Sequence, residues 1–198
     1  MTTKLVFEWS ILILAILFLI YAMVVIKEEK KSFLENAIAL NIGIFKLSIP
    51  SWWGKVIEEE NHLKFERQDT RYDWFCEYQW FEEGRNQRTI EQHIGDFLEE
   101  QRIVFDQDGV VIANPVSFKK IPLLNENTDY QVARVEGCAT QDGITRIYFD
   151  CFLLHPNPKT DQYFLAFSWS SVLNGAVEGP YFEESLYLLE KIENKKAI

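Results

Sequence analysis

The segment "GITRIYFDCFLLH" (residues 143–155) alternates so regularly that it predicts a β-strand. Successive side chains of a strand point to opposite faces of the sheet. The odd positions from Ile147 to Leu153 are all apolar, which predicts a face turned toward the core. The even positions from Arg146 to Phe152 mix charged and aromatic residues. This mixed face fits either a surface that binds a partner or a face whose charges pair with a covering helix.

Similar patterns predict the other elements of the chain. Strands are expected at residues 44–49, 62–67, 72–82, 110–112, 116–121, 129–138 and 162–170. Apolar residues recur at helical spacing in "RTIEQHIGDFLEEQR" (residues 88–102) and in "GPYFEESLYLLEKIEN" (residues 179–194), where Pro180 is expected in the first turn. The body of the chain therefore consists of strands that are interrupted by one helix and closed by another.

Two adjacent tryptophans follow a proline in "IFKLSIPSWWGKV" (residues 44–56). If the chain stays extended there, Trp52 and Trp53 point to opposite faces, because the side chains of a strand alternate. One ring would then fill the core. The other would belong either to a binding surface or to a second hydrophobic layer under a helix.

The N-terminal segment predicts a membrane anchor. Residues 9–26 carry no formal charge, and as a helix they would span roughly 27 Å, enough to cross the apolar part of a bilayer. Trp9 and Tyr21 lie near the two ends of this segment, where aromatic side chains favour the membrane interface. A cleaved signal peptide is less favoured, because the apolar segment is longer than usual and "AIA" (residues 37–39) lies beyond the charges at 27–31.

Good helix formers continue after the anchor to about Leu40. We therefore expect an anchor and stalk helix over residues 1–42 and one soluble domain over residues 43–198. Counting lysines on either side of the anchor places the domain in the cytoplasm, whereas single anchored domains are commonly delivered across the membrane. We favour a bacterial inner-membrane protein with a periplasmic domain, and the cytoplasmic orientation remains the alternative.

Composition argues against several classes of function. The net charge of −10 would repel phosphate backbones, so no nucleic-acid partner is expected. None of the three histidines lies at metal-ligand spacing from a cysteine or from a second histidine, so no metal or other cofactor is expected. No glycine-rich phosphate loop or nucleophile elbow occurs in the sequence, which argues against an enzyme. Cys76, Cys138 and Cys151 each lie in a strand-like segment. We therefore expect them to be free cysteines that are buried as small apolar core residues.

The order of segments resembles the PsbP-like superfamily. The resemblance rests on "FKLSIPSWW", "LKFER", a long strand, the helix "TIEQHIGDFLEEQ", a series of hairpins and a C-terminal helix, and it covers residues 43–193. This superfamily includes photosystem II subunit P, the Mog nuclear-import factors and the bacterial DcrB-like proteins with their Eag-type chaperones. The resemblance implies an α+β fold, with a central antiparallel sheet packed by helices, in proteins that are mostly non-enzymatic assembly factors, chaperones or binding subunits.

Together these features predict a non-enzymatic, membrane-anchored subunit that binds a protein within a bacterial envelope complex. A membrane anchor of its own favours a fixed position over a soluble shuttle. An immunity protein or chaperone that sequesters a toxin or an apolar effector segment is the alternative, and a lipid or small-ligand carrier with a deep apolar cavity is the third. The expected binding residues are Trp52, Trp53, Tyr130, Arg134, Arg146, Tyr148, Asp150 and Phe152.

Overall fold

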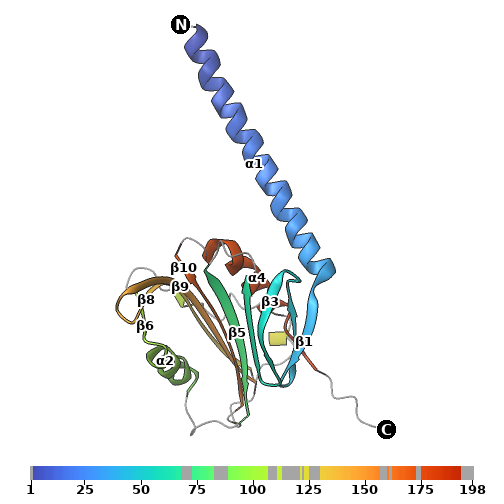
Figure 1. The fold of residues 1–198 in the computed structure, drawn as a ribbon, viewed down its shortest axis with the longest axis vertical. Coiled ribbons are helices and arrows are strands. Elements are labelled where there is room, and N and C mark those ends of the chain that lie inside the picture. The colour runs from blue at the N-terminus through green and yellow to red at the C-terminus, as the bar shows by residue number, and fades with distance from the viewer. Residues whose placement is uncertain are drawn as a thin grey trace. The chain divides into compact units, whose positions relative to one another are not determined.

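The computed structural model divides the chain into two compact units, residues 1–37 and residues 38–198 (Figure 1). The described residues are 2–67, 73–82, 89–106, 111–112, 121, 123–124, 130–156, 160, 162–172 and 175–192. The first unit is one long helix, and the second contains the sheets and the two remaining described helices.

Helix α1 (Thr2–Asn36) is apolar along most of its length. Large hydrophobic side chains from Phe7 to Ile26 are exposed, and Trp9 and Tyr21 are exposed with them. By length and composition the helix could cross a membrane, a property that it shares with signal sequences. Water is a poor solvent for so much apolar surface, because exposed apolar area carries a free-energy cost of about 25 cal/mol per Å².

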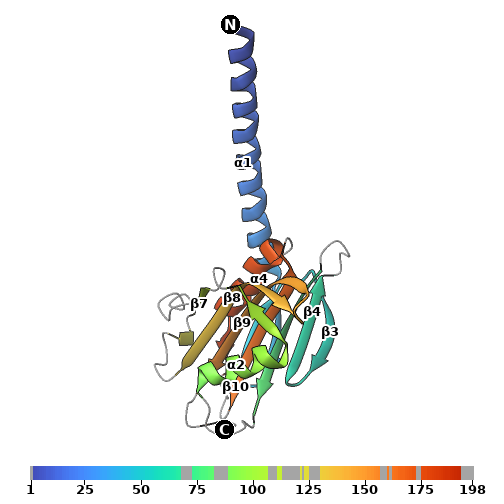
Figure 2. The same ribbon diagram turned by 90° about the vertical axis from the view of Figure 1, so that its left-hand side faces the viewer.

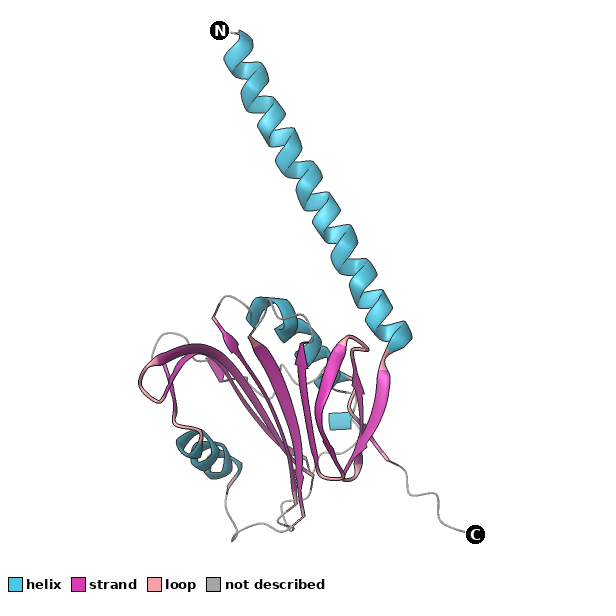
Figure 3. Ribbon diagram, viewed as in Figure 1, coloured by secondary structure: helices cyan, strands magenta, loops and turns pink. Residues whose placement is uncertain are grey.

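The second unit contains two antiparallel sheets (Figure 3). The large sheet contains β3 (Trp53–Glu59), β4 (His62–Arg67), β5 (Trp74–Phe81), β6 (Ile103–Phe105), β7 (Val111–Ile112), β8 (Gln131–Gln141), β9 (Thr145–His155) and β10 (Tyr163–Ser171). Its order is β3-β4-β5-β10-β9-β8-β6, and β7 also pairs with β8. The small sheet, in the order β1-β2-β11, contains β1 (Ile38–Ile42), β2 (Phe45–Ile49) and β11 (Glu190–Lys191). The described part of the chain thus confirms the α+β class and the antiparallel sheet.

The large sheet has a hydrophobic core on each of its faces. Helix α2 (Ile90–Glu100) packs on one face, and helix α4 (Gly175–Tyr187) packs with the small sheet on the other (Figures 1 and 2). The core under α2 includes Ile147, Phe149, Cys151 and Leu153 of β9, which confirms the predicted core face of that strand. We call this side the α2 side, and we call the opposite side the α4 side.

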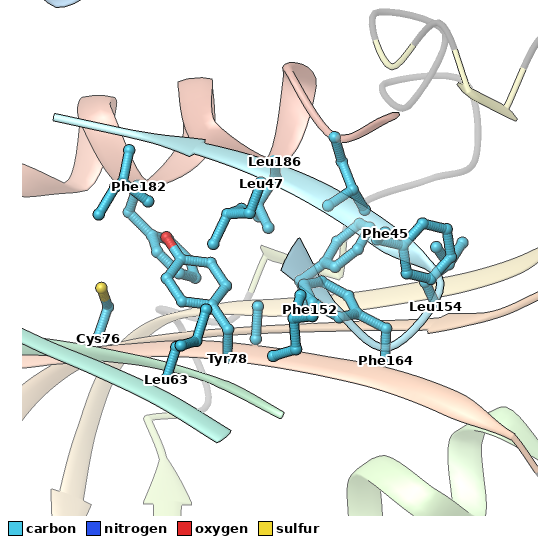
Figure 4. Packing of buried hydrophobic residues seen from close by; sticks show 14 of the residues in the cluster. Phe45, Leu47, Leu63, Cys76, Tyr78, Phe152, Leu154, Phe164, Phe182 and Leu186 are labelled. Atoms are coloured by element: carbon cyan, nitrogen blue, oxygen red, sulfur yellow. The ribbon is translucent and has the colours of Figure 1, made fainter. Parts of the chain in front are cut away.

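The core on the α4 side is rich in aromatic rings (Figure 4). Phe45 and Leu47 of the small sheet and Phe182 of α4 meet Tyr78 and Phe164 of the large sheet. The ring of Phe45 lies 5.6 Å from that of Phe164, in an edge-to-face arrangement. Such pairs contribute about 0.5–1.5 kcal/mol beyond the burial of their area.

Local sequence explains how individual elements begin and turn. Thr89 and Gln92 form a capping box at the start of α2, in which each side chain accepts a hydrogen bond from the other residue's backbone N–H. Gly43, with φ +52°, turns the chain between β1 and β2 and lies against the ring of Trp80. A Cβ atom at position 43 would approach Cγ of Trp80 to 2.2 Å, so this turn requires glycine.

Several boundaries differ from those expected. The helix predicted to reach about Leu40 ends at Asn36, and residues 38–42 form β1 because they pair along β2. Helix α4 begins at Gly175, so Pro180 lies inside it rather than in its first turn. The C-terminal segment leaves the helix at Tyr187, and β11 then pairs with β2.

Strands β3 and β6 were not expected at all. Each is an edge strand of the large sheet, and buried and exposed residues do not alternate cleanly along it. The strand predicted at residues 116–121 lies outside the described residues except for its last position.

Candidate functional site

The two adjacent tryptophans do not serve opposite faces. The chain turns after Pro50, where the N–H of Trp53 donates to the Pro50 carbonyl at 3.3 Å, so the extended geometry assumed in the prediction does not apply. Both indole N–H groups instead point to one carboxylate, Glu178 of α4, at 2.8 Å for Trp53 and 3.5 Å for Trp52. The ring of Trp52 packs edge-to-face on Tyr181 of the same helix, at 5.0 Å. Both tryptophans therefore attach α4 to the sheet.

Glu178 is the centre of this attachment. Its side chain is fully buried, with 0% exposure, and Arg67 at the end of β4 donates to it as well. The carboxylate thus accepts from a guanidinium and from two indole groups, which compensates the cost of burying its charge. Sequence reasoning missed Glu178, because no local pattern marks a carboxylate that pairs with strands more than 100 residues away.

A second charged cluster joins α4 to the middle of the sheet. Arg134 of β8 donates through Nε and Nη2 to both carboxylate oxygens of Asp150, at 2.9 and 2.7 Å. Its Nη1 donates to Glu183 of α4 at 2.9 Å, and its Nη2 also lies 3.0 Å from Glu136. The hydroxyl of Tyr148 donates to Glu136, and the hydroxyl of Tyr187 donates to Glu183. We call these six residues the Arg134 cluster.

Burial shifts the pKa values within the Arg134 cluster. Asp150 is only 2% exposed, and burial together with the neighbouring carboxylates raises its pKa to about 6, although Arg134 opposes the shift. Burial also disfavours the charge of Arg134, but its hydrogen bonds and charge interactions with Asp150, Glu136 and Glu183 together outweigh this effect and raise the arginine pKa. Burial, with the hydrogen bond to Glu183, raises the pKa of Tyr187 to about 12. Burial and the hydrogen bond to Glu136 raise the pKa of Tyr148 as well, so the arginine and both tyrosines keep their protons at neutral pH.

The remaining predicted binding residues are dispersed. Phe152 is 1% exposed and belongs to the α4-side core, where its ring lies 6.4 Å from that of Phe164. Tyr130 is half-buried against the same core. Arg146 is exposed and forms a bidentate pair with Asp106, with both contacts at 2.6 Å.

The prediction of one exposed mixed face is therefore corrected. Trp53, Arg134, Asp150 and Phe152 are buried. The competing interpretation, in which charges of this face pair with a covering helix, holds for Asp150 through Arg134 and Glu183. It does not hold for Arg146, whose partner Asp106 follows β6.

Side chains of the large sheet, the small sheet and α4 point toward one another on the α4 side, as those labelled in Figure 4 show. The rings of Tyr78 and Phe182 lie 5.8 Å apart, and the hydroxyl of Tyr78 pairs with that of Ser185 at 2.8 Å. A carrier of lipids would need a cavity between such layers. This packing of α4 and the small sheet therefore gives no support to the lipid-carrier alternative.

The α2 side of the large sheet differs, because α2 covers only part of it. The helix packs on β6, β8 and β9 and reaches β10 through the ring of Phe97, 5.1 Å from that of Phe167. Among the described residues, no helix packs on β3, β4 or β5 on this side (Figure 2). We call this region, together with the adjoining Trp169 of β10, the open face; its residues are Ile57, Glu59, His62, Lys64, Glu66, Phe75, Glu77, Gln79, Phe81 and Trp169. Tyr163 of β10 lies at its border, where its ring is 4.7 Å from that of His93 of α2.

The open face combines aromatic rings with a hydrogen-bonded polar centre. Glu77 accepts from Lys64 at 3.2 Å and from Gln79 at 3.2 Å, and lies 2.9 Å from His62. The ammonium group of Lys64 lies 4.2 Å from the ring centroid of Phe75. These five residues are all partly exposed rather than buried, so a partner could reach them.

Stacked aromatic pairs border this polar centre. The rings of Phe75 and Trp169 stack at 5.4 Å, and those of Phe81 and Tyr163 stack at 4.4 Å. Stacking fixes the ring planes, so a partner would meet a rigid surface that loses little side-chain entropy on binding. The signal for this surface was present in residues 72–82, where Phe75, Glu77 and the other odd positions alternate with the apolar core face.

The described residues offer neither a cluster of metal ligands nor, at Cys76 and Cys151, a reactive thiolate. Among them, no group of three or more His, Cys, Asp or Glu side chains could hold a metal ion. Cys76 and Cys151 are buried, and burial raises the pKa of both thiols, so neither is a reactive thiolate at neutral pH. All three cysteines are free, and Cys138 is half-buried.

Comparison with known proteins returns similarities of fold. No model of a protein family matches the sequence, and no curated protein matches it. The chain is similar to the Ran-binding protein Mog1p of Saccharomyces cerevisiae, at 8% identity and a TM-score of 0.46, over 79% of this chain and 96% of that one. It is similar to a point mutant of protein Mog1, at 9% identity and a TM-score of 0.48, over 80% and 97% of the two chains.

A crystal structure from Bacteroides thetaiotaomicron is similar at 14% identity and a TM-score of 0.46. The match covers 76% of this chain but only 46% of that protein, so this chain spans less than half the length of the Bacteroides protein. At such identities the likeness concerns the fold alone.

Proposed function

We propose that this chain is a non-enzymatic, single-pass membrane protein whose domain binds another protein within a bacterial envelope assembly. The observation that carries the proposal is the open face, a sheet surface of aromatic rings around a polar centre that no described helix covers. Interfaces favour aromatic side chains, with polar groups that fix the register of the partner.

The exposed apolar surface of α1 supports the membrane part of the proposal. Residues 9–26 form the segment in contact with lipid, with Trp9 and Tyr21 at its borders. The protein is anchored in the bacterial inner membrane, and its domain lies in the periplasm. The acidic charge of the chain disfavours nucleic acid as a partner.

Carbonate extraction of membranes tests the anchor. The intact chain should remain in the membrane pellet, because a spanning helix is held by its buried apolar area. Release of the full-length chain into the supernatant would contradict the anchor. A reporter that is active only outside the cytoplasm, fused after Ile198, tests the orientation, and an inactive reporter on a stable fusion would place the domain in the cytoplasm.

A pair of charge reversals tests the open face. Glu66 lies on it, opposite Phe75 in the register of β4 and β5. Glu58 lies on the other side of the sheet, opposite Leu63, and both glutamates are exposed. Glu66→Lys should reduce co-purification of the partner from detergent-solubilised membranes, and Glu58→Lys should not, at equal expression. Equal recovery with both variants would count against the open face.

A further inference from the structure

The Arg134 cluster ties α4 to the sheet through one shared guanidinium. Asp150 and Glu136 come from the sheet, whereas Glu183 comes from α4. Arg134 is only 8% exposed and Asp150 only 2%, so their charges interact in a poorly screened environment. Three carboxylates therefore compete for one guanidinium, and Glu183 is the one that links Arg134 to α4.

The groups that face Asp150 come from every element packed around it. Among the described residues these are Arg134 and Glu136 from β8, Tyr148 and the adjoining Cys151 from β9, Tyr78 from β5, and Glu183 from α4. Tyr187 of α4 acts on this group through its hydrogen bond to Glu183. Strand β10 places Ser168, which does not titrate, opposite Asp150. The thiol of Cys151 and the hydroxyl groups of Tyr78, Tyr148 and Tyr187 are neutral at pH 5–8, because burial raises their pKa values.

We propose that the Arg134 cluster is a pH-dependent fastening, in which proton uptake at Asp150 tightens the attachment of α4 to the sheet and proton release loosens it. Protonation removes one of the three negative charges that share Arg134. The guanidinium then interacts more strongly with Glu183, and the burial of Asp150 no longer carries the cost of burying its charge. The proton belongs to the coupled cluster, with Asp150 as its main site.

The sign of the effect follows from linkage. The pKa of Asp150 is about 6 in the folded protein, above its ordinary value of 3.8, mainly because of burial. Detachment of α4 would expose Asp150 to water and remove Glu183, so the pKa of Asp150 would fall toward its ordinary value. The closed state therefore binds the proton more tightly. The contribution is therefore largest at low pH and is lost as pH rises through about 6. Between pH 7 and pH 5, the equilibrium constant for detachment of α4 should fall about tenfold, which corresponds to about 1.4 kcal/mol.

Hydrogen exchange on the full chain in detergent micelles tests this fastening. After correction for the intrinsic exchange rate, protection of the α4 amides should rise about tenfold from pH 7 to pH 5. Helix α2, which packs on the other side of the sheet, is the internal reference and should show a smaller change. No change in α4, or an equal change in both helices, would overturn the proposal.

Two variants isolate the carboxylate. Asp150→Asn keeps the shape but does not titrate, so the pH dependence of α4 protection should disappear. The matched control is Asp106→Asn, because Asp106 forms the same bidentate pair with Arg146 at an exposed site, and this variant should retain the pH dependence of the wild type. Persistence of the dependence in Asp150→Asn would overturn the proposal.

A measurement on the unchanged protein keeps the proposal testable if Asp150→Asn fails to fold. The side-chain carboxyl carbon of Asp150 can be followed by NMR as pH is varied. A midpoint near 6 supports the fastening, and a midpoint below about 4.5, close to that of an exposed aspartate, overturns it.

Discussion

Replacing Gly43 with alanine tests the packing of the small sheet on the large one. Gly43 has φ +52°, and a Cβ atom there would lie 2.2 Å from Cγ, 2.3 Å from Cδ2 and 2.5 Å from Cδ1 of Trp80. The indole is 3% exposed and cannot move into solvent. Gly43→Ala therefore strains the backbone and also forces either the β1–β2 turn or the buried ring to move.

A matched control variant separates the cost of the backbone conformation from the cost of the steric clash. A left-handed backbone costs a non-glycine residue about 1–2 kcal/mol, and overpacking a core costs about 1–3 kcal/mol. Gly43→Ala should therefore destabilise the domain by about 2–5 kcal/mol in total. Gly143 is the matched control, because its φ is +72° and a Cβ atom there would meet nothing within 4 Å. Gly143→Ala should cost only the backbone part, about 1–2 kcal/mol.

Urea unfolding of the full chain in detergent micelles, followed by tryptophan fluorescence, measures both free energies of unfolding. The difference between the two variants is the part that arises from Trp80, expected at about 1–3 kcal/mol. A loss in Gly43→Ala no larger than that in Gly143→Ala would refute the close approach of the β1–β2 turn to Trp80.

Three further substitutions test single contacts by the same unfolding measurement. Glu178→Gln should cost about 2 kcal/mol, because Arg67 loses a charged partner at a buried site, and a change below about 0.5 kcal/mol would contradict that role. Tyr148→Ala should cost about 2 kcal/mol, between an exposed and a fully buried aromatic, because the ring is half-buried and its hydroxyl donates to Glu136. Gly95→Ala should stabilise α2 by about 0.5–1 kcal/mol, since nothing lies within 4 Å of the added methyl group, and a destabilisation would contradict that space.

Strands with a clear period of two could be predicted from the sequence. The alternation in 143–155 identified β9 and its core face, because burial of one face leaves a period of two in the sequence. Strand β1 could not be found in this way. Its sequence follows good helix formers without a break, and only its pairing with β2 makes residues 38–42 extended.

The candidate site was harder to predict, because its residues are joined by tertiary contacts. The mixed face of β9 identified Asp150 and Tyr148, but nothing local indicates that Arg134 and Glu183 would bury the aspartate. The direction of Trp52 and Trp53 depends on the turn after Pro50 and on Glu178, which lies 125 residues from Trp53. The alternation of residues 72–82 indicated the two faces of β5. It did not indicate which half of the sheet α2 would cover.

Site-specific photo-crosslinking of the intact chain in native membranes tests the proposed function most directly. A photoreactive residue at Gln79 or Glu66 lies on the open face, and one at Lys55 or Glu58 lies on the other side of the sheet near the same edge. We predict one discrete protein adduct of the same mass from both open-face positions and none from the two control positions. The same adduct from all four positions, or no protein adduct from the open face, would contradict the binding role of this face.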